Sequence, residues 1–196
     1  PWFLKGLWSP FVDIIRTKRW WIIAMQILLT ALCILLTISL PHPEAEAIAT
    51  KATEVSTFRF TLILFIIAAF ASATHDIAAD GYYMLAHDRK SQATFVGIRS
   101  TFYRIASVFA QGVLVYIAGR IEFYTGNIPL SWQITLGITS LLMLVITLYH
   151  TFLLPHSEDD LPRTTTNAKN TWRELGESFS TFFTKKGCGL AIAFML

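Results

Sequence analysis

The sequence predicts an all-α fold, a polytopic bundle of membrane-spanning helices, and three observations lead to this prediction. More than half of the 196 residues are hydrophobic (54%), and the mean hydropathy is positive. The apolar residues gather into blocks of about 20, the length at which a helix crosses a bilayer. The segments between the blocks alternate in charge. Because lipid offers the backbone no hydrogen-bond partner, we expect each block to be helical.

Taken in order, the blocks predict the end of one span, four complete spans and the start of another. The chain begins without Met or a signal-peptide arrangement of charges and ends inside an apolar run, so we expect a fragment of a longer protein. Cys33 and Cys188 lie far apart in apolar runs and predict neither a disulfide nor a metal site, and no cofactor is expected. The predicted spans are 1–12 (partial), 20–40, 58–85, 93–119, 132–154 and 187–196 (partial).

The charges of the connecting segments predict the orientation of the spans. Lys and Arg are concentrated in the connections at 13–19, 86–92 and 155–186. The connection at 41–57 is mainly acidic, and the one at 121–131 holds no Lys or Arg. The positive-inside rule therefore places the three basic connections in the cytoplasm.

The longest connection contains a predicted amphipathic helix at 171–186. Thr171 and Glu174 form a capping-box signal at its start, and the apolar residues that follow share one helical face. That face suits either the membrane surface or a packed position on the protein, and both readings remain open.

Two neighbouring spans carry charged residues, which are costly in lipid and therefore candidates for substrate binding or proton coupling. Asp76 and Asp80 are four residues apart and share one helix face. Counted from the cytoplasmic ends, Asp80 lies level with Arg99 and Asp76 level with Arg104. The two arginines are about 140° apart around their helix, so they cannot both face one neighbour. We expect Arg104 to face a cavity, and Arg99 to pair with Asp80 or contact lipid headgroups.

Polar residues form a stripe on each of two spans, Gln26–Thr30–Cys33–Thr37 on one and Ser100–Arg104–Ser107–Gln111 on the other. Successive spacings of 4, 3 and 4 residues keep each stripe on one helical face. The stripes predict either the lining of a shared aqueous cavity or hydrogen bonds between helices, which are common for Ser and Thr in membranes. The candidate cavity-lining residues are Gln26, Thr30, Ser100, Tyr103, Ser107 and Gln111.

Residues 9–19, which read SPFVDIIRTKR, resemble a signature of the major facilitator superfamily. That signature lies in the cytoplasmic loop between the second and third helices and consists of an Asp followed by a basic cluster. In the family the Asp helps to hold the inward gate closed. The resemblance assigns this role to Asp13, with Arg16 and Arg19 as its basic partners, while Ser9 replaces the family's leading Gly.

Residues 71–81, which read ASATHDIAADG, resemble the A-T-Q-D-I-A-x-D run of the anhydromuropeptide permease and acetyl-CoA transporter branch, with His75 in place of Gln. The Tyr103-Arg104 pair, followed by Gly112, resembles the next helix of that branch. The resemblance implies about helices 2–6 and the start of helix 7 of a larger parent. The implied units are a partial N-terminal half (1–154), a cytoplasmic interdomain linker (155–186) and the start of the C-terminal half (187–196).

The resemblance implies a secondary active transporter of a bacterial inner membrane, which moves an anionic or muropeptide-like sugar–peptide solute by proton-coupled alternating access. Arg104 would bind an anionic group of the solute and Asp76 would carry the proton. The expected partners are the solute, protons, the bilayer and the missing half of the same polypeptide, and nucleic acid is not expected.

Three other readings compete with transport through this segment. One is a structural Asp76–Arg104 clamp, with the substrate site in the missing half. Another is an intramembrane enzyme that uses His75 with Asp76, although no enzyme activity is expected. The third is a non-transporting sensor or scaffold on the same fold.

Overall fold

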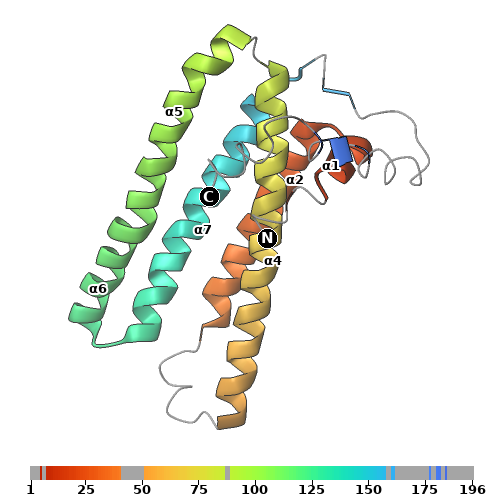
Figure 1. Ribbon diagram of the computed structural model, residues 1–196. Helices are drawn as coiled ribbons and strands as arrows, with labels where there is room; N and C mark the ends of the chain where they lie inside the picture. The colour runs from red at the N-terminus through yellow and green to blue at the C-terminus, as the bar shows by residue number, and fades with distance from the viewer. Residues whose placement is uncertain are drawn as a thin grey trace.

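A computed structural model describes residues 5, 8–40, 51–86, 89–157, 160–161, 177, 180–181 and 184. Every element in this part of the chain is helical, which confirms the predicted all-α bundle (Figure 1). The elements are α1 (Ser9–Ile15), α2 (Lys18–Ser39), α4 (Lys51–Ala86), α5 (Arg89–Val108), η2 (Phe109–Val113), α6 (Leu114–Thr125) and α7 (Ile128–Leu153).

Four helical stretches are long and apolar enough to cross a membrane. They cover Lys18–Ser39, Val55–Ala86, Phe95–Thr125 and Ile128–Leu153. Each overlaps one of the four complete spans that hydropathy predicts. Two helices extend into segments that were predicted to be connections. α4 begins at Lys51, inside the predicted connection 41–57, and α6 continues to Thr125, inside the predicted connection 121–131. Hydropathy marks only the apolar part of a helix, and polar residues extend these helices beyond it.

Local capping explains where α2 and α7 begin. The Thr17 side chain accepts a hydrogen bond from the Trp20 backbone N–H at 3.2 Å, and the Asn127 side chain accepts one from Leu130 N–H at 2.9 Å. Before Asn127, Gly126 ends α6 with a φ of 66°, a left-handed conformation that glycine adopts without steric cost. The α6–α7 connection is therefore a tight turn.

The first predicted segment, 1–12, lies in large part outside the described residues. Within the described part, helix α1 begins at Ser9, after a turn at Trp8. Pro10 lies in the first turn of α1, where its missing N–H has no helical partner to lose. The predicted helix at 171–186 and the predicted span at 187–196 lie mainly or wholly outside the described residues.

The third span is continuous but not uniform. A π-helical stretch, η2, separates α5 from α6, and Gly112 lies within it. A π-helical turn inserts an extra residue and rotates the side chains on either side relative to each other. The stripe from Ser100 to Gln111 therefore ends inside a segment that does not follow ideal α-helical phase.

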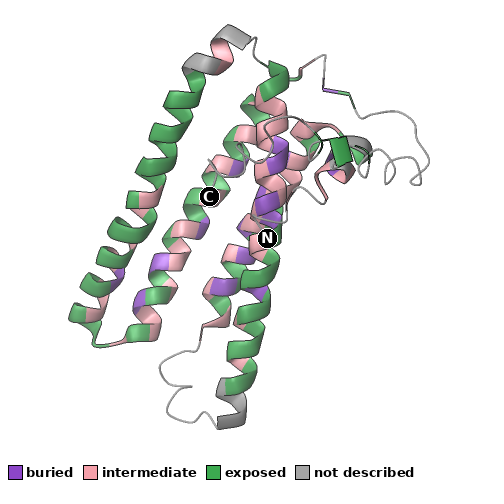
Figure 2. Ribbon diagram, viewed as in Figure 1, coloured by how far each residue is buried: buried purple, intermediate pink, exposed green. Residues whose placement is uncertain are grey.

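The bundle is organised around α2, which packs against both α4 and α7, while α6 packs against α7. One core cluster joins Leu32 and Leu36 of α2 to Leu64 of α4. The outer faces remain apolar and exposed, and exposed residues run along nearly all of α5 and α6 (Figure 2). An apolar exposed surface on membrane-length helices suits contact with lipid or with further membrane helices.

Candidate functional site

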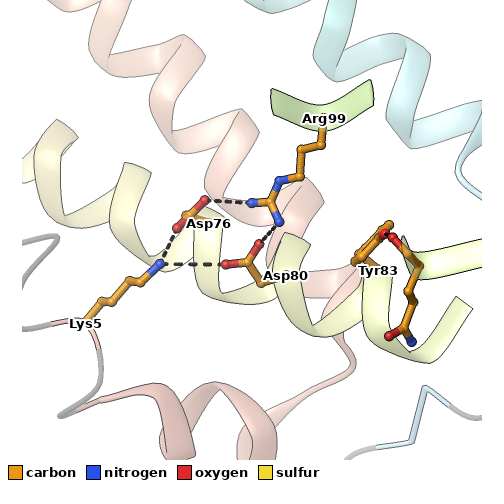
Figure 3. A network of polar contacts seen from close by, with 6 residues as sticks. Lys5, Asp76, Asp80, Tyr83 and Arg99 are labelled. Atoms are coloured by element: carbon orange, nitrogen blue, oxygen red, sulfur yellow. Dashed lines mark hydrogen bonds and ion pairs between the residues drawn. The ribbon is translucent and has the colours of Figure 1, made fainter. Parts of the chain in front are cut away.

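Four charged side chains from three segments meet at the side of α4 (Figure 3). Lys5 Nζ, from the segment before α1, lies 2.5 Å from Asp76 Oδ2 and 3.7 Å from Asp80 Oδ2. Arg99 of α5 lies 3.4 Å from Asp76 Oδ1 through one guanidinium nitrogen, and its other terminal nitrogen pairs with Asp80 Oδ1. We call these four residues the charge network.

The charge network follows from local helix geometry. Asp76 and Asp80 are one helical turn apart, so both carboxylates lie on one face of α4. The planar guanidinium of Arg99 presents several N–H donors in a fixed fork, which allows it to contact two carboxylates together. Lys5 reaches both from the opposite side (Figure 3). Ion pairs thus connect α4 with α5 and with the segment before α1.

The network balances its formal charges, two cations against two carboxylates. Its side chains are neither fully buried nor free: Asp76 is 22% exposed and Arg99 51%. Lys5 lies outside the four candidate spans, and its hydrogen bond to Asp76 raises the pKa of its ammonium group, with burial acting in the opposite direction. Lys5 is therefore a stable positive partner at neutral pH.

The structure pairs Asp80 with Arg99, one of the two positions expected for that arginine. It does not pair Asp76 with Arg104: Asp76 contacts Lys5 and Arg99, and no ion pair of Arg104 occurs within the described ranges. Arg104 is exposed on α5. Arg99 reaches both carboxylates because they are adjacent on one face of α4. Both carboxylates are thus paired without Arg104.

The other predicted residues of α5 and η2 lie on the outside of the described bundle. Tyr103 is 74% exposed, and Ser100 and Gln111 are also exposed, while Ser107 is half-buried. The stripe that Ser100, Ser107 and Gln111 form with Arg104 is exposed except at Ser107.

The polar stripe of α2 lies in the contact between α2 and α7. Gln26 and Thr30 are buried against α7, where Gln26 Nε2 lies 2.7 Å from His150 Nδ1 and Thr30 Oγ1 lies 3.0 Å from Thr147 Oγ1. Gln26 and Thr30 thus make hydrogen bonds between helices, the alternative that was left open for this stripe. The physical reason is that polar groups inside a membrane satisfy one another when no water is available.

The basic residues of the predicted gate occupy separate positions. Arg16 is exposed and its guanidinium carbon lies 5.9 Å from the centre of the Trp20 ring. Arg19 donates from Nε to the Leu154 carbonyl oxygen at 2.9 Å and from its terminal nitrogen to that of Thr151 at 3.1 Å. Asp13 belongs to α1, and its side chain is outside the described part of the chain.

Sequence reasoning missed two residues. One is Lys5, whose signal was a lone cation inside an apolar run, a pattern that calls for a carboxylate partner. The other is Asp160, which is buried and accepts hydrogen bonds from the backbone N–H groups of Lys18 at 2.6 Å and Arg19 at 2.9 Å. No local sequence pattern links Asp160 to a helix start more than 140 residues away.

Comparison with known proteins adds one likeness. No protein-family model and no solved structure matches the chain significantly. Among curated proteins, the chain is similar to "Putative transporter AmpG 4" of Rickettsia conorii, with 27% identity over 168 residues. The match covers 82% of this chain but 35% of that protein, so the chain spans about a third of the relative's length. Together with four membrane-length helices, this likeness supports a multi-pass membrane protein of a transporter-like kind.

Proposed function

We propose that the whole protein is a secondary active transporter of the major facilitator type, and that this chain supplies most of its N-terminal half. It imports an anionic, muropeptide-like sugar–peptide solute across a bacterial inner membrane by proton-coupled alternating access. The charge network is the observation that carries the proposal. Two carboxylates and two cations within a helical membrane bundle are costly and suit a transport role better than a packing role.

In this proposal, the charge network couples a proton to helix movement. While Asp76 is ionised, its carboxylate holds Lys5 and Arg99 in place. Protonation removes that negative charge and weakens both contacts, so α5 and the segment before α1 become free to move relative to α4. Protonation of one acid is a sufficient local trigger when it biases two packed arrangements of the bundle.

The solute itself is proposed to bind at Arg104. This arginine is exposed and has no ion pair within the described ranges, so its guanidinium is available for a carboxylate or phosphate. Ser100, Ser107 and Gln111 share its stripe and add hydrogen-bonding groups, and Tyr103 adds an aromatic face for a sugar ring. Asp13, Arg16 and Arg19 are proposed to form the cytoplasmic gate, and the hold of Arg19 on the end of α7 supports a role at that face.

Uptake of anhydromuropeptide into proteoliposomes tests the substrate assignment. We expect Arg104→Gln to raise the KM for the anionic solute by about tenfold, the loss of one charge-assisted contact, and to leave kcat little changed. The matched control is Arg120→Gln, which makes the same change on α6, where Arg120 bonds the Tyr124 hydroxyl at 2.6 Å. Equal KM values for the two variants would remove Arg104 from the solute site.

The geometry argues against the enzyme alternative. A catalytic histidine beside Asp76 would be oriented by that carboxylate, as in a catalytic triad. Here Asp76 Oδ2 contacts Lys5 and Asp76 Oδ1 contacts Arg99. The Nε2 atom of His75 is buried and has no hydrogen-bond partner in the described part of the chain.

A further inference from the structure

A groove lies beside the first three turns of α2, on a different helix from the charge network. Its volume is about 530 Å³, within the range of sites that hold small ligands. One wall comes from α2, and the other from the segment that follows α7. The groove is therefore built where a membrane span meets the start of the long connection.

The α2 wall of the groove is apolar. It consists of Trp20, Ile23, Ala24 and Ile27. The last three follow Trp20 by 3, 4 and 7 residues, which places all four on one face of the helix. Trp20 and Ile27 remain 46% and 54% exposed. This face lies within a membrane-length span, where an acyl chain is a suitable contact for it. From Trp20 to Ile27 the wall extends about 10 Å, which suits the upper part of one acyl chain.

The mouth of the groove is polar and carries positive charge. Thr17, His156 and Ser157 supply hydrogen-bonding side chains at the rim. Arg16 stands next to the rim, exposed and with its guanidinium over the Trp20 ring, and it forms no ion pair among the residues the structure describes.

The other charged groups of the mouth are already engaged. Asp160 also lines the groove, but its carboxylate accepts hydrogen bonds from Lys18 N–H and Arg19 N–H at the positive end of the α2 dipole. The Arg19 guanidinium binds the end of α7. The charge that remains available at the mouth is therefore that of Arg16.

From this combination we infer that the groove binds an anionic phospholipid. The acyl chain lies along Trp20, Ile23, Ala24 and Ile27, and the headgroup phosphate contacts Arg16 and the polar rim. Basic pockets beside membrane helices are established recognition sites for anionic headgroups, and an aromatic ring at the water interface stabilises that position. A zwitterionic lipid fits the apolar wall equally well but gains less from Arg16.

Photolabelling in nanodiscs tests this inference with the whole protein. Phosphatidylglycerol or phosphatidylcholine, each with the same photoreactive acyl chain, is supplied at equal mole fraction. We expect phosphatidylglycerol adducts on the peptide that carries Trp20–Ile27, in about fivefold excess over phosphatidylcholine adducts, the effect of one basic side chain near an anionic surface. Arg16→Gln is expected to remove this excess while labelling itself persists.

Filling the groove provides the second arm of the test. Ala24→Trp places a large side chain on the apolar wall and is expected to abolish the adducts. Ala31→Trp is the matched control, because Ala31 is exposed two turns further along the same helix and outside the groove. If Ala24→Trp does not fold, Ile27→Asn weakens the same wall without filling the groove.

Three results would overturn the inference. Equal labelling by the two lipids would show that the groove does not select for charge. Equal adducts in Ala24→Trp and Ala31→Trp would show that the groove is not the site. Lipid adducts confined to peptides outside Trp20–Ile27 would show that the acyl chain lies elsewhere.

Discussion

Arg99 explains how two aspartates coexist on one face of a membrane helix. Asp76 and Asp80 are a single turn apart, and two neighbouring carboxylates repel each other unless cations are shared between them. Arg99 contacts both, and Lys5 contacts both from the other side (Figure 3). No pair in the network is independent, so the effect of each substitution depends on the others.

The network predicts compensation between substitutions of opposite charge. Asp80→Asn leaves a net charge of +1 and Arg99→Gln leaves −1, so each alone should lower the free energy of unfolding by about 1–2 kcal/mol, less than for a fully buried pair. The double variant restores balance and should lose less than the sum, with a coupling energy of about 1 kcal/mol. Thermal and denaturant unfolding in detergent micelles measures all three, and strictly additive losses would contradict the shared network.

Helical periodicity predicts some of the network and not the rest. It places Asp76 and Asp80 on one face and Asp80 level with Arg99, because both follow from distances along a helix. It does not choose between Arg99 and Arg104, because the rotation of α5 about its own axis depends on tertiary packing. Lys5 was beyond this reasoning, since contact between segments 71 residues apart requires the fold.

At the scale of elements, α2 uses its polar stripe to hold α7. Thr30 Oγ1 lies 3.0 Å from Thr147 Oγ1, and further along Thr37 Oγ1 lies 3.3 Å from Ser140 Oγ. Both pairs are inaccessible or nearly so. The sequence shows that the stripe exists, but a stripe facing water and a stripe facing another helix have the same spacing.

This interface predicts a modest and local stability effect. Thr30→Val removes the interhelical hydrogen bond while keeping the shape of the side chain, and should lower the free energy of unfolding by about 0.5–1 kcal/mol. Adding Thr147→Val should cost less than Thr30→Val alone, because the Thr30 hydroxyl is already gone and the remaining interhelical contact of Thr147, to Gln26 O, is long at 3.5 Å. Thr101→Val is the control: Thr101 is exposed and its hydroxyl bonds Gly97 O of its own helix. An equal loss in the control would mean that the interhelical bond contributes nothing.

Two side chains lock the ends of α2 and α7 to each other. Asp160 accepts from the first N–H groups of α2, and Arg19 of α2 donates to the last carbonyl groups of α7. Both contacts satisfy backbone groups that a helix end leaves without partners. The start of the long connection is thereby fixed to the bundle.

Asp160→Ala should release this end of α2. We expect a loss of about 1 kcal/mol, as for other N-cap truncations, and faster amide exchange at Lys18 and Arg19. Hydrogen exchange with mass spectrometry reports that change peptide by peptide. Leu161→Ala serves as the control because Leu161 is adjacent and 76% exposed. If amide exchange at Lys18 is unchanged in Asp160→Ala, the Asp160 carboxylate does not cap the start of α2.

At the scale of the whole molecule, the ion pairs and the packing follow different routes through the bundle. α2 packs on α4 and α7, and α6 packs on α7, while the charge network ties α5 to α4 (Figure 1). In the third span, α5 is thus held to α4 by ion pairs, and α6 is held to α7 by packing. Loss of charge at Asp76 would weaken the hold on α5 and leave the packed core intact. This arrangement supports a bundle in which protonation moves one helix without unfolding the rest.

The spans could be predicted from hydropathy because lipid imposes both their length and their helicity. The π-helical stretch at Phe109–Val113 could not, since its residues are compatible with an ordinary helix. The helix starts at Ser9 and Lys51 were also missed, because helix ends depend on capping and on polar extensions that hydropathy does not detect.

The most direct test of the central claim compares two transport assays on the same proteoliposomes of the whole Asp76→Asn protein. One assay measures accumulation of anhydromuropeptide driven by a proton gradient, and the other measures counterflow exchange, which needs no net proton movement. If Asp76 carries the coupled proton, the variant loses accumulation but retains exchange. If accumulation and exchange fall together, Asp76 is a structural clamp, and if both persist at the wild-type level, Asp76 is not needed for transport; either result contradicts the proposed coupling role.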